Sequence, residues 1–259
     1  MTRRKQLLGA LMLCVISLYA FAAANATAAE LTAVTCEAVT AGTGNYSTSA
    51  CETPKVAGKN FETKALPVGQ TTEVSGKGPG TATLRLTAAF VNTQVTCEET
   101  EGSGHVTNRE PSAGKHTIEG SKILIDYKKC HAALQSDLTK KCEVESITGT
   151  AGIKGTIATT ELKATTTTEH NIKFEPAVAG GALAEFKILT GGCAIPNVTV
   201  KLTGSVLGVA NTSRHSHLTF TPATNGGLLK GNGSAASYEG TSNGVMKGTT
   251  NIIGAETFT

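Results

Sequence analysis

The stretch Val198-Thr199-Val200-Lys201-Leu202-Thr203 alternates apolar and polar residues without a break. Successive side chains of a β-strand point to opposite faces, so this pattern predicts a strand with one buried face and one solvated face. Thr83-Leu84-Arg85-Leu86-Thr87 shows the same alternation much earlier in the chain. Valine, isoleucine and threonine favour strands, and glycine and asparagine interrupt the runs at turns. The chain is therefore predicted to be built from strands.

The same features recur along most of the sequence. Strands are predicted over residues 81–90, 94–98, 115–118, 122–128, 155–164, 169–175, 183–189, 198–209, 215–221 and 244–253. Residues 131–138 are the best helical candidate and predict one short turn of helix. Many short strands joined by glycine-rich turns indicate an all-β fold, an antiparallel sandwich or barrel.

The first residues have the composition of an export signal. Arg3, Arg4 and Lys5 precede an uncharged apolar run, which ends in small residues with Ala-x-Ala sites at 24–26 and 26–28. A basic start, an apolar middle and a small-residue end predict a signal peptide over residues 1–28. The alternative is a membrane anchor, since the run approaches the roughly 18 residues that a span requires. The small-residue end favours cleavage, after which no stable membrane insertion is expected, and the protein is expected to be secreted or to lie at the cell surface.

Composition also suggests how the rest of the chain divides. Residues 29–68 contain two cysteines and are expected to form a small N-terminal segment closed by a disulfide. Residues 69–80 hold four glycines and a proline, which is typical of a linker. Residues 81–259 are expected to form the antiparallel β domain, with a long glycine-, asparagine- and serine-rich loop from residue 225 and a closing strand from Val245.

Six cysteines follow the predicted signal: Cys36, Cys51, Cys97, Cys130, Cys142 and Cys193. An even set in an exported chain predicts disulfides. Sequence leaves several pairings open, and short loops favour Cys36 with Cys51 and Cys130 with Cys142, which leaves Cys97 for Cys193. The rival explanations are a zinc site and a catalytic cysteine. No two cysteines have the close spacing of zinc ligands, and an oxidising compartment disfavours a free thiol.

Charge and aromatic content limit the function classes. The net charge is +3, and Arg3, Arg4 and Lys5 belong to the predicted signal, so the mature chain is close to neutral. Nucleic-acid binding is not expected, because it requires a clustered basic face. Tryptophan is absent and aromatic residues make up 4% of the chain. Small side chains bury little apolar area each, so disulfides are expected to offset a thin core.

The chain shows no strong catalytic, cofactor or metal motif, and no such site is predicted. The chain is therefore expected to be a non-catalytic exported protein that acts as a structural or binding module. Its partner is unknown, and the expected kinds of partner are a surface and another protein. The alternative is a secreted hydrolase that uses the Glu98-Glu99-Glu101 group or the His215 and His217 pair. A third hypothesis is a subunit that assembles by strand pairing along an open edge at residues 244–253.

Several short motifs resemble those of a known group of proteins. These motifs are Val95-Thr96-Cys97, Ile123-Leu124-Ile125-Asp126-Tyr127, Lys141-Cys142, Gly155-Thr156-Ile157-Ala158-Thr159, Ala184-Glu185-Phe186 and Gly204-Ser205-Val206. In this order, over residues 81–221, they resemble a group of uncharacterised secreted proteins of soil actinobacteria. The segment 36–51, with Gly42-Thr43-Gly44-Asn45-Tyr46, is similar to such proteins too. The resemblance implies a secreted β-rich protein with cysteines at these places, and it implies no activity or site residue. Ala194-Ile195-Pro196 departs from the pattern of the group.

Overall fold

A computed structural model describes residues 30–52, 60–78, 80–87, 92–110, 118–149, 151–167, 170–191, 193–211, 217–223, 228–247 and 252–258. Residues 30–258 form one compact unit. Its strands are β1 (Glu30–Ala38), β2 (Phe61–Ala65), β3 (Thr71–Gly78), β4 (Ala82–Thr87), β5 (Asn92–Asn108), β6 (Ile118–Leu134), β7 (Asp137–Ser146), β8 (Thr156–Ala158), β9 (Leu162–Thr166), β10 (Asn171–Pro176), β11 (Ala182–Leu189), β12 (Val198–Gly204), β13 (Val206–Ala210), β14 (His217–Phe220), β15 (Leu229–Gly231), β16 (Ser234–Met246) and β17 (Ile252–Phe258).

The strand pairings close into two rings. One ring, here called the β3 ring, follows the order β3, β5, β6, β9, β10, β13, β14, β16 and back to β3. The other, the β4 ring, follows the order β4, β5, β6, β7, β11, β12, β15, β16 and back to β4. All of these pairings are antiparallel. The prediction of an all-β, antiparallel fold is therefore confirmed. The prediction allowed a sandwich or a barrel, and the closed rings of paired strands correspond to a barrel.

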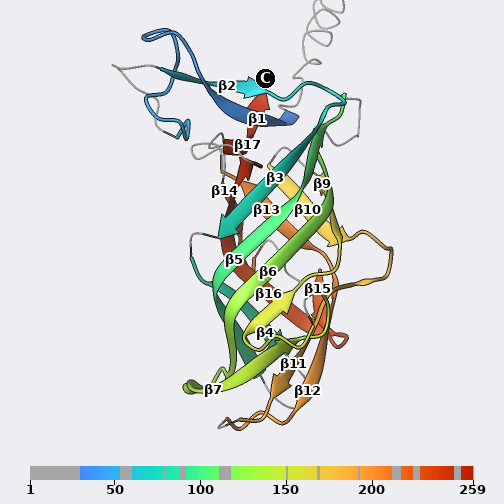
Figure 1. Cartoon of the computed structure of the whole chain (residues 1–259). Coiled ribbons are helices and arrows are strands. Elements are labelled where there is room, and N and C mark those ends of the chain that lie inside the picture. Colours follow the sequence, from blue (N-terminus) through green and yellow to red (C-terminus); the bar gives the residue numbers. More distant parts are fainter. Residues whose placement is uncertain are drawn as a thin grey trace, which may run out of the picture. The chain divides into compact units, whose positions relative to one another are not determined.

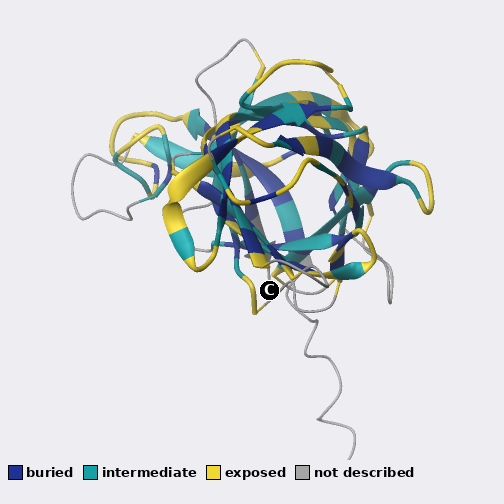
Figure 2. Ribbon diagram, turned by 90° about the horizontal axis from the view of Figure 1, so that it is seen from below, coloured by how far each residue is buried: buried dark blue, intermediate teal, exposed yellow. Residues whose placement is uncertain are grey.

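Three long strands belong to both rings. The strands β5, β6 and β16 run diagonally along the unit, with β3, β9, β10, β13 and β14 around one half and β4, β7, β11, β12 and β15 around the other (Figure 1). Along β5 the partner changes from β4 at residues 92–97 to β3 at residues 100–107. The rings therefore meet near residues 98 and 99. Seen from one end, buried segments surround a common interior and exposed ones lie in the peripheral loops (Figure 2).

The first and last strands close one end of the β3 ring. The strand β1 lies between β2 and β17, and β17 pairs in turn with the end of β16. The buried side chain of Asn108 holds this sheet against β5. Its Oδ1 accepts from Ala33 N at 2.9 Å, and its Nδ2 donates to Ala33 O at 3.0 Å and to Leu66 O at 2.9 Å. Every one of these polar groups is thus satisfied without water.

Three predictions about local structure are wrong. The expected linker at 69–80 contains β3, and the segment 29–68 is joined to the rest by the pairing of β1 with β17. The expected loop from residue 225 contains β15 and most of β16. In both places glycine and serine suggested loops, yet the backbone is paired on both sides. The expected helical turn at 131–138 is the β6–β7 hairpin, since cross-strand pairing overrides the short apolar run. The predicted signal, residues 1–28, and strand 115–118, except Ile118, lie outside the described residues.

The disulfides are Cys36–Cys51, Cys97–Cys130 and Cys142–Cys193. The first is the predicted pair, whereas the predicted Cys130–Cys142 and Cys97–Cys193 pairs are wrong. Strand register is the reason. Cys97 lies directly opposite Cys130 between β5 and β6, with their Cα atoms 4.0 Å apart, whereas the residue opposite Cys142 is Ala132. Cys193 follows β11, whose Leu189 pairs with Glu143, and this brings Cys193 to Cys142.

The β4 ring contains the larger hydrophobic core. Phe186, Ile188, Val144 and Val95 are almost completely buried there, and two disulfides lie in the same cluster. The core of the β3 ring and its end sheet is smaller and is built around Leu31, Ile118, Ile172 and other apolar residues. Within the described residues no helix has the length and apolar character needed to cross a membrane.

Candidate functional site

Glycine replaces large side chains on the inner face of the β3 ring. Along β5, Thr100, Gly102, Gly104 and Val106 face the interior, and Ser103 also borders it. Neighbouring strands contribute inward glycines in the same region: Gly76 and Gly78 on β3, Gly120 on β6 and Gly244 on β16. The wall is β-sheet with register shifts between Ser103 and His105 of β5 and between Gly120 and Ile123 of β6, and it carries little side-chain volume.

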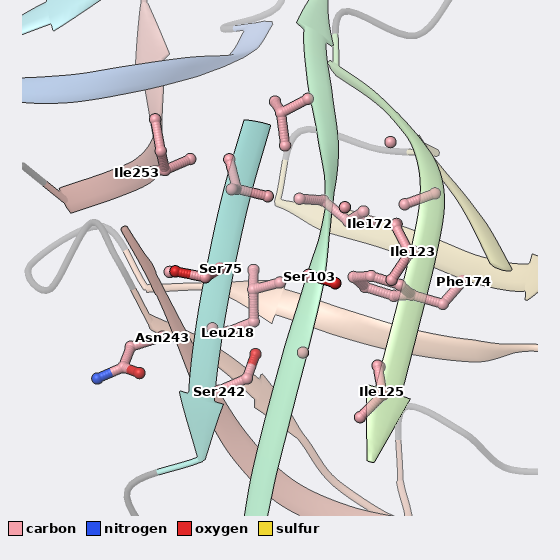
Figure 3. Close-up of a pocket in the computed structure, with 18 of the residues that line it drawn as sticks. Ser75, Ser103, Ile123, Ile125, Ile172, Phe174, Leu218, Ser242, Asn243 and Ile253 are labelled. Atoms are coloured by element: carbon pink, nitrogen blue, oxygen red, sulfur yellow. The ribbon is translucent and has the colours of Figure 1, made fainter. Parts of the chain in front are cut away.

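A cavity of about 180 Å³ lies inside this wall. Apolar side chains face it from the opposite strands, and Ile123, Ile172 and Phe174 converge on it from β6 and β10 (Figure 3). Leu218 of β14 also lines it, whereas the side chain of Asn243 points away (Figure 3). Ala33, Ile253 and Ala255 line it from the end sheet. The volume is comparable to the engineered cavity of about 150 Å³ that stays dry and binds benzene.

The glycines that line the cavity have two different effects on the packing around it. A Cβ on Gly120 would lie only 2.7 Å from Ile123 Cδ1, so this glycine provides room for the isoleucine. A Cβ on Gly244 would lie 3.6 Å from its nearest neighbour, the carbonyl oxygen of Ile253, which is ordinary van der Waals contact. Space beside Gly244 is therefore left empty, and a larger residue at this position would extend into the cavity.

A second cavity, of about 110 Å³, adjoins the first inside the β4 ring. It is bordered mainly by aliphatic side chains, among them Leu84, Val95 and Leu202. Four residues line both cavities: Thr100, Ile125, Phe174 and Ser242. The level at which the two cavities meet, here called the junction, is therefore also the level at which the two rings meet.

Four aromatic rings cross the interior near the junction. The ring centroids of Phe174 and Phe220 are 5.7 Å apart, those of Phe220 and Tyr238 are 5.3 Å apart, and those of Tyr238 and Tyr127 are 6.0 Å apart. The tilted and edge-to-face geometries are those that aromatic quadrupoles favour. In a chain with few aromatic residues, this concentration places rigid, flat rings beside the residues that line both cavities.

The hydroxyl groups of Tyr127 and Tyr238 are hydrogen-bonded to each other inside the second cavity. Burial raises the pKa of both groups, because the apolar surroundings disfavour phenolate. Hydrogen bonding to Tyr238 lowers the pKa of Tyr127, whereas the charge and the hydrogen bond of Tyr127 raise the pKa of Tyr238 further. Both groups therefore remain protonated at neutral pH.

The residues that line the two cavities provide no charge to the interior. Among these described residues Lys77 is the one with a charged side chain, and that side chain is 78% exposed and lies 3.7 Å from Glu101. An ionised ligand group buried here would lack a countercharge, which carries a large desolvation penalty. The interior is thus suited to uncharged molecules.

The carboxylates considered for hydrolysis lie outside the barrel. Glu98 and Glu99 are exposed, Glu99 forms a short ion pair with Lys129, and Glu101 lies 2.6 Å from Lys128. The hydrogen bond and charge of Lys128 lower the pKa of Glu101. Glu101 is therefore an ionised outer-surface group, and it cannot supply a proton at neutral pH.

The structure describes only one of the two histidines that were considered for hydrolysis, His217. His215 lies outside the described residues, and His217 Nδ1 lies 3.5 Å from Glu52 Oε1. The described part of the chain contains no group of three or more histidine, cysteine, aspartate or glutamate residues arranged to hold a metal. The six cysteines after the predicted signal are paired in disulfides.

Sequence reasoning missed the cavities. Gly102-Ser103-Gly104 lies between the predicted strands 94–98 and 115–118, and Gly76-Lys77-Gly78 lies in the expected linker. Both have the alternation of a half-buried strand, with glycine in place of the apolar residue. Gly-polar-Gly within a strand pattern is the signal that could have indicated a hollow wall.

Comparison with known proteins returns no match: no family model, no curated protein and no solved structure matches the chain.

Proposed function

We propose that this chain is an exported, non-catalytic binding module that holds a small apolar molecule inside the β3 ring. The observation that carries the proposal is the cavity of about 180 Å³ whose wall is thinned by inward glycines. At Gly244 an added methyl group would meet its nearest neighbour at 3.6 Å and would bury apolar area, worth about 0.8 kcal/mol per CH₂ group. At Gly76, Gly78, Gly104 and Gly120 an added Cβ would lie less than 3.0 Å from a neighbouring atom, so these glycines allow close packing of the wall. A binding role explains why the space beside Gly244 is left open.

The disulfides support the exported part of the proposal. Three disulfides in one chain fit an oxidising compartment, as does the sequence of residues 1–28. The outward faces of the rings carry ion pairs such as Arg85 with Glu239 at 3.0 Å and Lys247 with Glu73 at 2.8 Å. An apolar interior within a charged exterior is the arrangement of a carrier that shields its ligand from water.

The test uses benzene as a probe and Gly244→Leu as the blocking variant. Benzene should raise the thermal unfolding temperature of the oxidised wild-type protein, because a ligand of the folded state alone stabilises it by mass action. In Gly244→Leu the leucine occupies the cavity, and the benzene-dependent rise should disappear.

The matched control is Gly80→Leu, since a Cβ at Gly80 would meet no atom within 4 Å. This variant should keep the response to benzene. If Gly244→Leu fails to fold, Gly244→Ala replaces it and should weaken the response. A wild-type protein whose unfolding temperature does not respond to benzene would overturn the proposal.

A further inference from the structure

The two cavities provide space for a molecule longer than benzene. They share Thr100, Ile125, Phe174 and Ser242, so they adjoin along the axis of the barrel. Their volumes are about 180 and 110 Å³, together roughly twice that of the engineered cavity that binds benzene. A flexible chain of on the order of nine carbon atoms therefore matches the space better than a single ring does.

Hydroxyl-bearing residues are most numerous near the middle of this space, and Ser75 and Ser103 also border the first cavity, on β3 and β5. The hydroxyl-bearing residues Thr100 and Ser242 line both cavities, and Tyr127 and Tyr238 line the second cavity beside them. The far part of the first cavity is bounded by Ala33, Ile253 and other apolar residues. A ligand would therefore meet hydrogen-bonding groups near its centre and hydrocarbon on both sides.

The tyrosine pair supplies hydrogen-bond donors. Tyr127 and Tyr238 both line the second cavity with their ring centroids 6.0 Å apart, and each phenol carries one hydrogen that it can donate. An acceptor atom of a ligand at the junction would accept a hydrogen bond from this pair. An acceptor that is buried without a hydrogen bond carries a desolvation penalty, so a donor at this position favours binding of a ligand that has an acceptor there.

We infer that the ligand is an uncharged, unbranched chain with a hydrogen-bond acceptor, such as a ketone or ester carbonyl, near its middle. Its two hydrocarbon arms occupy the two cavities and its acceptor lies at the junction, where Tyr127 donates to it. This inference rests on the proposed function and adds the chemical class of the ligand. Free carboxylates are excluded by the uncharged lining.

The test compares nonan-5-one and nonane, which have equal chain length and differ in the central carbonyl. Their affinities are measured by titration calorimetry or by the shift in unfolding temperature. Tyr127→Phe should weaken binding of nonan-5-one roughly fivefold to tenfold, the size expected for loss of one hydrogen bond. Binding of nonane should stay unchanged. Nonanoate should bind far more weakly than nonan-5-one at neutral pH.

The matched control is Tyr46→Phe, which removes a phenolic hydroxyl beside the Cys36–Cys51 disulfide and should change neither affinity. If Tyr127→Phe fails to fold, Tyr238→Phe removes the other hydroxyl of the same pair and should also weaken binding of nonan-5-one selectively. Equal losses for both probes, or no loss for either, would overturn the inference. If benzene and nonane bind but nonan-5-one shows no dependence on the tyrosines, the proposed function stands and only the inferred ligand class fails.

Discussion

The β3 ring and the β4 ring share three strands but fill their interiors differently. On β5 the inward residues Val95 and Cys97 belong to the packed core of the β4 ring, whereas Gly102 and Gly104 face the cavity of the β3 ring. Two disulfides join the β4 ring, at Cys97–Cys130 and Cys142–Cys193. One continuous strand thus supports two differently filled halves, a larger core around a cavity of about 110 Å³ in the β4 ring and a smaller core around a cavity of about 180 Å³ in the β3 ring. Backbone pairing holds the sheet together whichever residues face inward.

The largest expected loss of stability concerns the disulfides. In the chain-entropy model, loss of Cys142–Cys193, which spans 51 residues, should lower the free energy of unfolding by about 4 kcal/mol, against about 3 kcal/mol for Cys36–Cys51, which spans 15 residues. The measurement is denaturant unfolding of the Cys142→Ala/Cys193→Ala and Cys36→Ala/Cys51→Ala proteins. A larger loss of unfolding free energy for Cys36→Ala/Cys51→Ala than for Cys142→Ala/Cys193→Ala would show that the cross-link in the β4 ring is not the more stabilising one.

A matched pair of isoleucines compares the packing of the two rings directly. Ile188 is 1% exposed within the β4 ring core, whereas Ile172 borders the cavity of the β3 ring. Truncation costs more where more contacts are lost, so Ile188→Ala should lower the free energy of unfolding by about 4 kcal/mol and Ile172→Ala by about 2 kcal/mol. Chemical denaturation of both variants measures the difference. Equal losses would mean that the β3 ring is packed as tightly as the β4 ring.

The smallest expected effect concerns pH and the tyrosines of the junction. Burial raises the pKa of Tyr127 and Tyr238 above the ordinary value of 10.0, so between that value and the folded-state pKa the unfolded chain has lost protons that the folded chain keeps. Stability from this source is complete below pH 10.0 and is lost as pH rises through the folded-state pKa. Wild-type protein should therefore lose more unfolding free energy above pH 10.0 than Tyr127→Phe/Tyr238→Phe.

The comparison with the variant is needed because Lys128, Lys129 and Lys154 also have raised pKa values, caused by hydrogen bonds to Glu101, Glu99 and Glu143. These lysines act in the same direction and are present in both proteins. Ultraviolet absorbance of tyrosinate provides a second readout, since burial should shift the ionisation of Tyr127 and Tyr238 to higher pH. Parallel pH profiles for the two proteins would contradict the burial of these hydroxyls.

Sequence patterns located strands best where large apolar residues alternate with polar ones. The predicted segments at 183–189 and 198–209 correspond to β11, β12 and β13, because their inward positions carry leucine, valine and phenylalanine. The same reasoning failed for β3 and for the second half of β5, whose inward positions include Gly76, Gly102 and Gly104, and for residues 234–243 of β16. The failures therefore coincide with the cavity wall, and the candidate site lay where the apolar signal was weakest.

Local order along the chain was enough to establish an all-β protein with strands buried on one face, because the alternation of side chains is a property of each strand alone. Its composition also showed that aromatic packing would be sparse. Cysteine pairing and the hollow interior arose from register between strands that are distant in sequence. A glycine in a turn and a glycine in a cavity wall look alike until neighbouring strands show which face it occupies, and a cysteine bonds to whichever sulfur the register brings opposite to it.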